Sequence, residues 1–167
     1  MQTKRLTTGL SLVEVALTLA LAAALVAAVQ IYYHTASEKL KTERTLAQAT
    51  QIIAAVGHLF GMRNDFSGLS NATIIPEMDA QSVDGGHLES PFKGAIVVSS
   101  QQLGRWSLME SGLPLQACMR LASQRFGSAL TRTVVNQQPL VAGRPLPAQL
   151  ASLCHRGDDN QLTLYFR

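Results

Sequence analysis

The longest apolar stretch of the chain lies near its N-terminus. Residues 10–29 read LSLVEVALTLALAAALVAAV, in which three side chains are polar: Ser11, Glu14 and Thr18. A helix of about 20 residues spans roughly 30 Å, which is the hydrocarbon thickness of a bilayer. The preceding residues, MQTKRLTTG, are polar, and Lys4 and Arg5 favour the cytoplasmic side for this flank. The pattern predicts a membrane-spanning helix, with the rest of the chain outside the cytoplasm.

The helical pattern continues beyond this apolar block. Residues 30–62 are rich in Ala, Leu, Glu, Lys and Gln, which favour helix, and the first proline is Pro76. After a polar belt over residues 37–44, apolar side chains recur at steps of three and four: Leu46, Ala49, Ile53, Val56 and Phe60. We therefore expect one long helix over residues 10–62, whose second half is amphipathic and packs on a globular domain.

The pattern changes after residue 62, where turn residues, strands and a helix alternate. Strands are expected at residues 94–99, 105–110, within 132–140 and at 161–166, a helix at 113–126, and a proline-rich loop at 142–148. Residues 63–167 are therefore predicted to form a globular head. The fold class is α+β, a long N-terminal helix packed on an antiparallel sheet.

Charge gives little reason to expect a nucleic-acid partner. The formal net charge is +3 and the pI is near 9.1, but the positive charges are scattered, and two of them are Lys4 and Arg5. No basic stripe interleaved with aromatic residues is present, so no nucleic-acid binding is expected.

The sequence contains no recognisable catalytic motif. It has no GxSxG, Walker A or GxGxxG sequence. The histidines are isolated and show no metal-ligand spacing: His34, His58, His87 and His155. We expect neither an enzyme nor a cofactor or metal site.

Glu14 is the unexpected residue in the apolar block. A carboxylate in a membrane helix is costly, and a plain one-span anchor or a secretory signal peptide gains nothing from it. If the chain is cut between Gly9 and Leu10, however, the new amino group at Leu10 lies four residues before Glu14. In a filament of staggered helices, the amine of one subunit could pair with the carboxylate of the next and fix their register.

The stretch Gly9-Leu10-Ser11-Leu12-Val13-Glu14 resembles the processing site of type IV pilins, and Leu10 is similar to the first mature residue of the type IVb subclass. The pieces LFGMRNDFSGLSN, IIPEM, SPFKGAIVV and NQLTLYF also resemble bundle-forming and conjugative thin-pilus subunits of that subclass. The resemblance implies that residues 1–9 are a leader removed by a prepilin peptidase, with N-methylation of Leu10. It also implies a precursor in the bacterial inner membrane and a self-assembled extracellular pilus, built by the pilus assembly machinery, that supports adhesion, aggregation or conjugative contact.

Two cysteines occur, Cys118 and Cys154. Two unrelated buried thiols are one reading, but an exported chain favours a disulfide because the compartment is oxidising. In type IVb pilins, two cysteines bracket a C-terminal region, and Cys118 and Cys154 match that role.

Two other functions remain open at this point. A minor pilin or a type II secretion pseudopilin would share the N-terminal features. A membrane-anchored periplasmic binding protein that does not polymerise would keep an uncut N-terminus and have a ligand pocket.

Overall fold

The computed structural model describes residues 11–61, 65–102, 104–140 and 147–167. The chain divides into two compact units, Met1–Lys39 and Leu40–Arg167, and we call the second the head. Helix α1 (Leu12–Phe60) contributes to both, so the predicted long helix is confirmed over that range. Leu10, where the helix was expected to begin, lies outside the described residues.

The first unit, as described, is the N-terminal part of α1. Ser11 precedes the helix and acts as its cap, because its side-chain oxygen accepts a hydrogen bond from the backbone N–H of Val13 at 3.3 Å. The Ser11 carbonyl also accepts hydrogen bonds from the backbone N–H groups of Glu14 and Val15. Glu14 therefore sits in the first turn, where a negative charge is favoured by the helix dipole.

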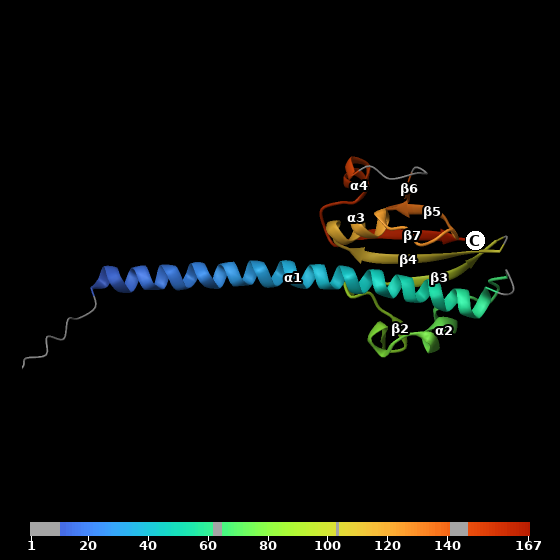
Figure 1. Cartoon of the computed structure of the whole chain (residues 1–167), viewed down its shortest axis with the longest axis horizontal. Helices are drawn as coiled ribbons and strands as arrows, with labels where there is room; N and C mark the ends of the chain where they lie inside the picture. The colour runs from blue at the N-terminus through green and yellow to red at the C-terminus, as the bar shows by residue number, and fades with distance from the viewer. Residues whose placement is uncertain (1–10, 62–64, 103, 141–146) are drawn as a thin grey trace, which may run out of the picture. The chain divides into compact units, whose positions relative to one another are not determined.

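The head is built on a five-stranded antiparallel sheet in the order β3-β4-β7-β5-β6. Its strands are β3 (Ile96–Gln101), β4 (Arg105–Leu113), β5 (Leu130–Val135), β6 (Gln138–Pro139) and β7 (Asn160–Phe166). The remaining elements are α2 (Asn71–Ile74), α3 (Leu115–Ser123), α4 (Pro147–Leu153), the 3-10 turns η1 (Ile75–Glu77) and η2 (Ala80–Ser82), and the hairpin β1 (Val83–Asp84) and β2 (His87–Leu88). Figure 1 shows the C-terminal strand β7 in the middle of the sheet, between β4 and β5.

One face of this sheet is covered by helices. Along β7 burial alternates, with Leu162, Leu164 and Phe166 buried and the residues between them half-buried. The part of α1 within the head and helix α3 contribute to the same core. Trp106 belongs to this core: it is 4% exposed, and its ring is stacked on that of Phe166 at a centroid distance of 4.3 Å.

The amphipathic half of α1 is packed as expected, with one difference. Of the predicted stripe, Ala49 and Val56 are buried and the other members are partly buried against the core. The most deeply buried helix positions also include Ile52 and two polar residues, Thr45 and Gln48. The side-chain nitrogen of Gln48 donates to the carbonyl oxygen of Glu89 at 2.9 Å, whereas its side-chain oxygen is buried without a partner among the described residues.

In the C-terminal part of the head, two elements differ from those expected from the sequence. The predicted loop at 142–148 ends in helix α4, which begins at Pro147; residues 142–146 lie outside the described residues. Proline is well tolerated there because the first helical position needs no N–H donor. The helix expected at 113–126 is shorter, since Leu113 ends strand β4 and Pro114 caps α3.

Two asparagines hold the segments around β7 together. Asn160 is fully buried, and its side-chain nitrogen donates to the carbonyl oxygens of Leu113 and His155. Its side-chain oxygen accepts from the side-chain nitrogen of Asn136 at 2.9 Å. Asn136 also donates to the carbonyl oxygen of Leu153, so this pair links β4, the β5–β6 turn and the end of α4.

Candidate functional site

The first unit exposes a continuous apolar helix surface. By length and composition α1 can cross a membrane: its most apolar window has a mean hydropathy of 2.5, and the part of the chain that the structure describes buries none of that window. Its large exposed side chains are Leu12, Val13, Val15, Leu17, Leu19, Leu21, Leu25, Val26, Val29 and Ile31. Covering each is worth roughly 1.5–3 kcal/mol relative to water, so this surface requires lipid or other helices around it.

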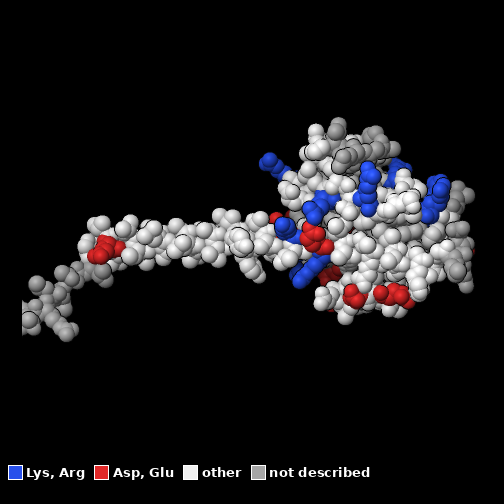
Figure 2. Space-filling view, viewed as in Figure 1, with Lys and Arg blue, Asp and Glu red and all other residues white. Residues whose placement is uncertain are grey.

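A single carboxylate interrupts this surface. Glu14 is the only Asp, Glu, Lys or Arg in residues 6–37. Figure 2 shows the surface of this segment as uncharged apart from acidic atoms near its N-terminal end. Gly9 and Leu10, the predicted cleavage position, lie outside the described residues. The cleavage, the methylation of Leu10 and the pairing of its amine with Glu14 therefore stay predictions.

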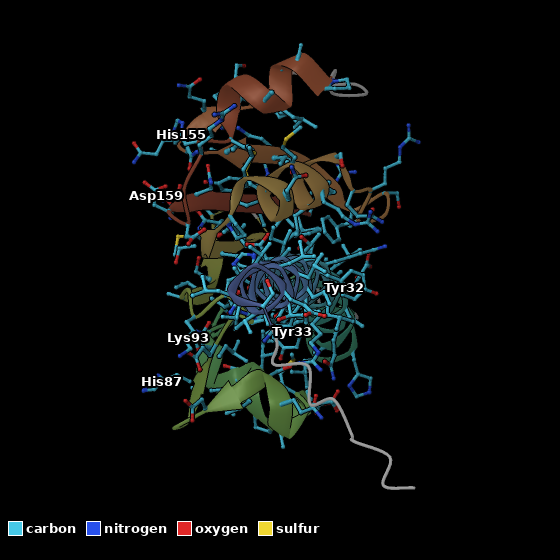
Figure 3. The ribbon with its side chains drawn as sticks, turned by 90° about the vertical axis from the view of Figure 1, so that its left-hand side faces the viewer. Tyr32, Tyr33, His87, Lys93, His155 and Asp159 are labelled. Atoms are coloured by element: carbon cyan, nitrogen blue, oxygen red, sulfur yellow. A yellow bond between two sulfur atoms is a disulfide. The ribbon has the colours of Figure 1, made fainter. Side chains whose placement is uncertain are left out.

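A pair of tyrosines marks the other end of the apolar segment, and the sequence reasoning did not single it out. Tyr32 and Tyr33 are 77% and 74% exposed, and Figure 3 shows them pointing to different sides of the helix. Directly after them, His34 lies 3.7 Å from the carboxylate of Glu38, which is one turn further along the helix. Tyrosines between apolar and polar segments are typical of the membrane–water interface, because the ring is apolar and the hydroxyl needs water. The sequence signal that could have identified them is their position three and four residues after Val29, where the apolar block ends.

The head is closed at its C-terminal end by a disulfide. Cys118 on α3 is bonded to Cys154 directly after α4, with a Cα–Cα distance of 6.0 Å, and both residues are buried. The bridge encloses β5, β6 and α4, so it fixes the segment that leads into the central strand β7.

The head also contains a buried acid that the sequence reasoning missed. Glu110 on β4 is 4% exposed and accepts a hydrogen bond from the hydroxyl of Ser90 at 2.7 Å. Burial raises the pKa of this carboxyl from 4.5 to about 7, and the Ser90 hydrogen bond opposes the shift. Its position in the sequence could have revealed this burial. Trp106, Leu108 and Glu110 are two residues apart along β4, so their side chains lie on the same, buried face of the strand.

Glu110 should make the head less stable as pH rises. Its carboxyl holds its proton more tightly in the folded state than in the unfolded chain, so the free energy of unfolding falls between pH 4.5 and about 7. The loss is on the order of 3 kcal/mol above pH 7. Glu110→Gln, which keeps the hydrogen bond without the charge, is expected to be more stable than the wild type at pH 8 and similar to it at pH 4.

Urea unfolding of the detergent-solubilised full chain, followed by the fluorescence of Trp106, measures this difference at both pH values. Asp84→Asn removes an exposed carboxylate on β1 and serves as the control. Equal stability of Glu110→Gln and the wild type at pH 8 would contradict the argument.

Elsewhere in the head, a cavity of about 650 Å³ lies between α1 and the segment from η2 to β3. Its charged lining residues have both signs: Arg44, Asp79, Asp84, Glu89 and Lys93. Figure 3 shows Lys93 on the same side of the head as His87. Among the residues that the structure describes, no three His, Cys, Asp or Glu side chains are grouped so as to hold a metal ion.

Comparison with known proteins places these features in a family. The family model for Bundlin matches residues 34–165, which covers most of the chain. Two curated relatives, from Escherichia coli O127:H6 (strain E2348/69 / EPEC) and from Escherichia coli O111:H-, are each described as "Major structural subunit of bundle-forming pilus". Each is 26% identical over 185 residues, which cover 98% of this chain and 95% of the relative.

Proposed function

Since the chain belongs to the Bundlin family of type IVb pilins, we propose that it is a structural pilus subunit that polymerises through its N-terminal helix. The observation that carries the proposal is the apolar surface of α1, which none of the described residues covers along its most apolar window. In a filament, the helices of neighbouring subunits cover one another, and the heads form the outer surface. The role is structural and involves no catalysis.

Before assembly, the same helix would anchor the precursor in the inner membrane. Lys4 and Arg5 would hold the N-terminal flank in the cytoplasm, and the head would lie on the other side. The disulfide between Cys118 and Cys154 supports this placement, because such bonds persist in oxidising compartments. The helix would then leave the membrane for the filament with the help of the pilus assembly machinery.

Processing would create the group that pairs with Glu14. Cleavage after Gly9 by a prepilin peptidase would leave a free, N-methylated amine at Leu10, four residues before Glu14 in the sequence. Lipid offers the carboxylate of Glu14 no partner, whereas a staggered neighbour offers this cation. The ion pair would therefore favour the filament over the membrane and select one stagger between helices.

Gly9 should be essential for this cleavage. Gly9→Val places a branched side chain next to the scissile bond, and we expect the precursor to accumulate uncut, with no filaments. Intact mass and N-terminal sequencing measure the product, and Thr8→Val at the neighbouring position is the control. A wild-type mature chain that begins at a residue other than Leu10 would contradict the cleavage site.

Electron microscopy of cells that express the chain with a type IVb assembly system tests the proposal directly. Abundant filaments made of this chain are expected, as for a major subunit; the names of both relatives favour this over a minor pilin or a pseudopilin. Trace amounts within filaments of another protein would indicate a minor subunit. A membrane protein that never enters a filament would contradict the proposal. Aggregation, adhesion or mating contact can then be assayed on the same cells.

A further inference from the structure

The segment 90–94 between β2 and β3 forms a tight turn, which we call the Ser90 turn. The backbone N–H of Ser90 donates to the carbonyl oxygen of Gly94, and the N–H of Lys93 donates to that of Ser90. Lys93 has a φ of 63°, a left-handed conformation that a residue with a Cβ enters at a cost. Because ordering each residue also opposes the turn, it depends on contacts with the rest of the head.

Side chains anchor the Ser90 turn to two elements of the head. On β4, the carboxyl of Glu110 accepts the hydrogen bond from the hydroxyl of Ser90 at 2.7 Å. On α1, Gln48 donates to the carbonyl oxygen of the residue before the turn, and the ammonium of Lys41 lies 5.9 Å from the centre of the Phe92 ring. Among these groups, Glu110 is the one whose charge changes near neutral pH.

The surroundings of Glu110 suit a neutral carboxyl better than an ionised one. Its partners on the neighbouring strands β3 and β7, Ile96 and Leu162, are buried and apolar. The hydroxyl of Ser90 satisfies one of about four acceptor sites that a carboxylate presents. Burial therefore raises the pKa of this carboxyl to about 7 in spite of that bond.

Charged groups on the surrounding elements do little to compensate an ionised Glu110. Strand β3 has no titratable residue, and on β7 the titratable residue is Tyr165, which alternates with the buried positions and therefore lies on the opposite face. The titratable residues of α1 within the head, apart from Arg44, have partners: Lys41 with Phe92, Glu43 with Arg120 of α3, and His58 with Glu77. The basic side chains of these helices, apart from Arg44, are thus engaged elsewhere.

The cavity next to the Ser90 turn is the route by which water can reach Glu110. Ser90 bonds Glu110 and also lines this cavity of about 650 Å³, so movement of the turn opens a path to the carboxyl. Arg44 and Lys93 line the cavity together with three acids: Asp79, Asp84 and Glu89. The cavity therefore offers an ionised Glu110 hydration and no excess of positive charge.

We propose that the Ser90 turn is a pH-controlled cover over Glu110: it stays closed while the carboxyl is neutral and opens when the carboxyl ionises. Hydrating a carboxylate is favoured over leaving it buried with a single donor, and opening also releases the left-handed conformation of Lys93. The segment therefore has two states near neutral pH, and the medium around the head selects between them. The inference goes beyond the proposed function, because it does not require assembly.

The sign of the effect follows from the two protonation states. With the turn closed, the pKa of Glu110 is about 7, and it returns toward its ordinary value of 4.5 when water reaches the carboxyl. Between these two values, each unit of pH raises the ratio of open to closed turn by up to about tenfold. The turn is thus expected to be closed in acid and open in mildly alkaline medium.

Hydrogen–deuterium exchange of the detergent-solubilised full chain at pH 5.5 and pH 8 measures the opening, with rates corrected for the pH dependence of intrinsic exchange. In the wild type, the protection of residues 89–94 should fall at least about tenfold between the two pH values. The amides of β7, in the centre of the sheet, should lose less protection because only opening of the whole head exposes them.

Two variants fix the turn in one state each. Glu110→Gln keeps an acceptor for Ser90 and cannot ionise, so the turn should stay protected at both pH values. Ser90→Ala removes the anchor on β4, so the turn should exchange at pH 5.5 about as fast as the wild-type turn does at pH 8. His87→Gln is the control, because His87 lies in the preceding strand β2 and is the nearest histidine in sequence. It should behave as the wild type does.

Disulfide formation, measured on the same samples, verifies that each variant folds. Equal protection of the wild-type turn at both pH values would overturn the proposal, as would a pH-dependent loss that persists in Glu110→Gln. A loss that disappears in His87→Gln would assign the titration to the histidine instead. A loss of equal size in β7 would show general destabilisation without local opening. Each of these outcomes overturns the pH-controlled cover and leaves the proposed pilus function intact.

Discussion

Replacing Glu14 with Ala or Val should abolish filament assembly while membrane insertion and cleavage continue. Both substitutions make the helix more apolar, so insertion should improve. They also remove the only Asp, Glu, Lys or Arg of residues 6–37, and with it the proposed partner of the Leu10 amine. That amine would then be buried in the filament without compensation, at a cost of several kcal/mol per subunit.

The measurement is filament yield by shearing and electron microscopy, together with the N-terminal sequence of the membrane-bound chain. Thr18→Ala is the matched control, because Thr18 is polar and on the same helix, but its hydroxyl is already bonded to the carbonyl oxygen of Val15. Glu14→Gln keeps a hydrogen-bonding side chain of similar size but removes the negative charge. Because the charge is what pairs with the amine in this proposal, this variant should also fail to assemble. Normal yield from Glu14→Ala and Glu14→Val would refute the register argument.

Removing the disulfide should have the second large effect. Cys118→Ala with Cys154→Ala frees a loop whose ends are 36 residues apart. The chain-entropy estimate for such a loop is roughly 3–4 kcal/mol of stability. A head of this size has only about 5–15 kcal/mol in total, so the variant should accumulate poorly and yield few filaments.

The urea midpoint of the full chain in detergent measures this loss through the fluorescence of Trp106, which is the only tryptophan. A reducing agent provides an independent arm: it should lower the midpoint of the wild type and leave that of the double variant unchanged. An identical midpoint for both proteins under oxidising conditions would contradict the estimate.

The spacing of apolar and polar residues along the chain was enough to predict the long helix and several strands of the head. Periodicity and turn residues predict the apolar and amphipathic halves of α1, the strands β3 and β4, and the closing strand β7. Helix α4 was missed because prolines at 145 and 147 suggested a loop, although Pro147 starts the helix. Proline marks a helix start as readily as a break.

The features that could not be predicted from the sequence depend on contacts between residues that are far apart along the chain. The position of β7 between β4 and β5 depends on strand pairing across the whole head. Asn160 directly precedes the strand expected at 161–166 and was not singled out in the sequence, yet it is fully buried and bonds the carbonyl oxygens of Leu113 and His155. For the candidate assembly site, the motif around Glu14 was readable in the sequence, and its partner is expected from another subunit.

The central position of β7 has a consequence for the order of events in biosynthesis. The sheet cannot close until the residues of β7 are available, because β4 and β5 both pair with β7 and not with each other. On the proposed route, the N-terminal helix can enter the bilayer while the head is still being synthesised. The head would thus cross the membrane unfolded, as a translocation channel requires, and fold only when its last strand has emerged.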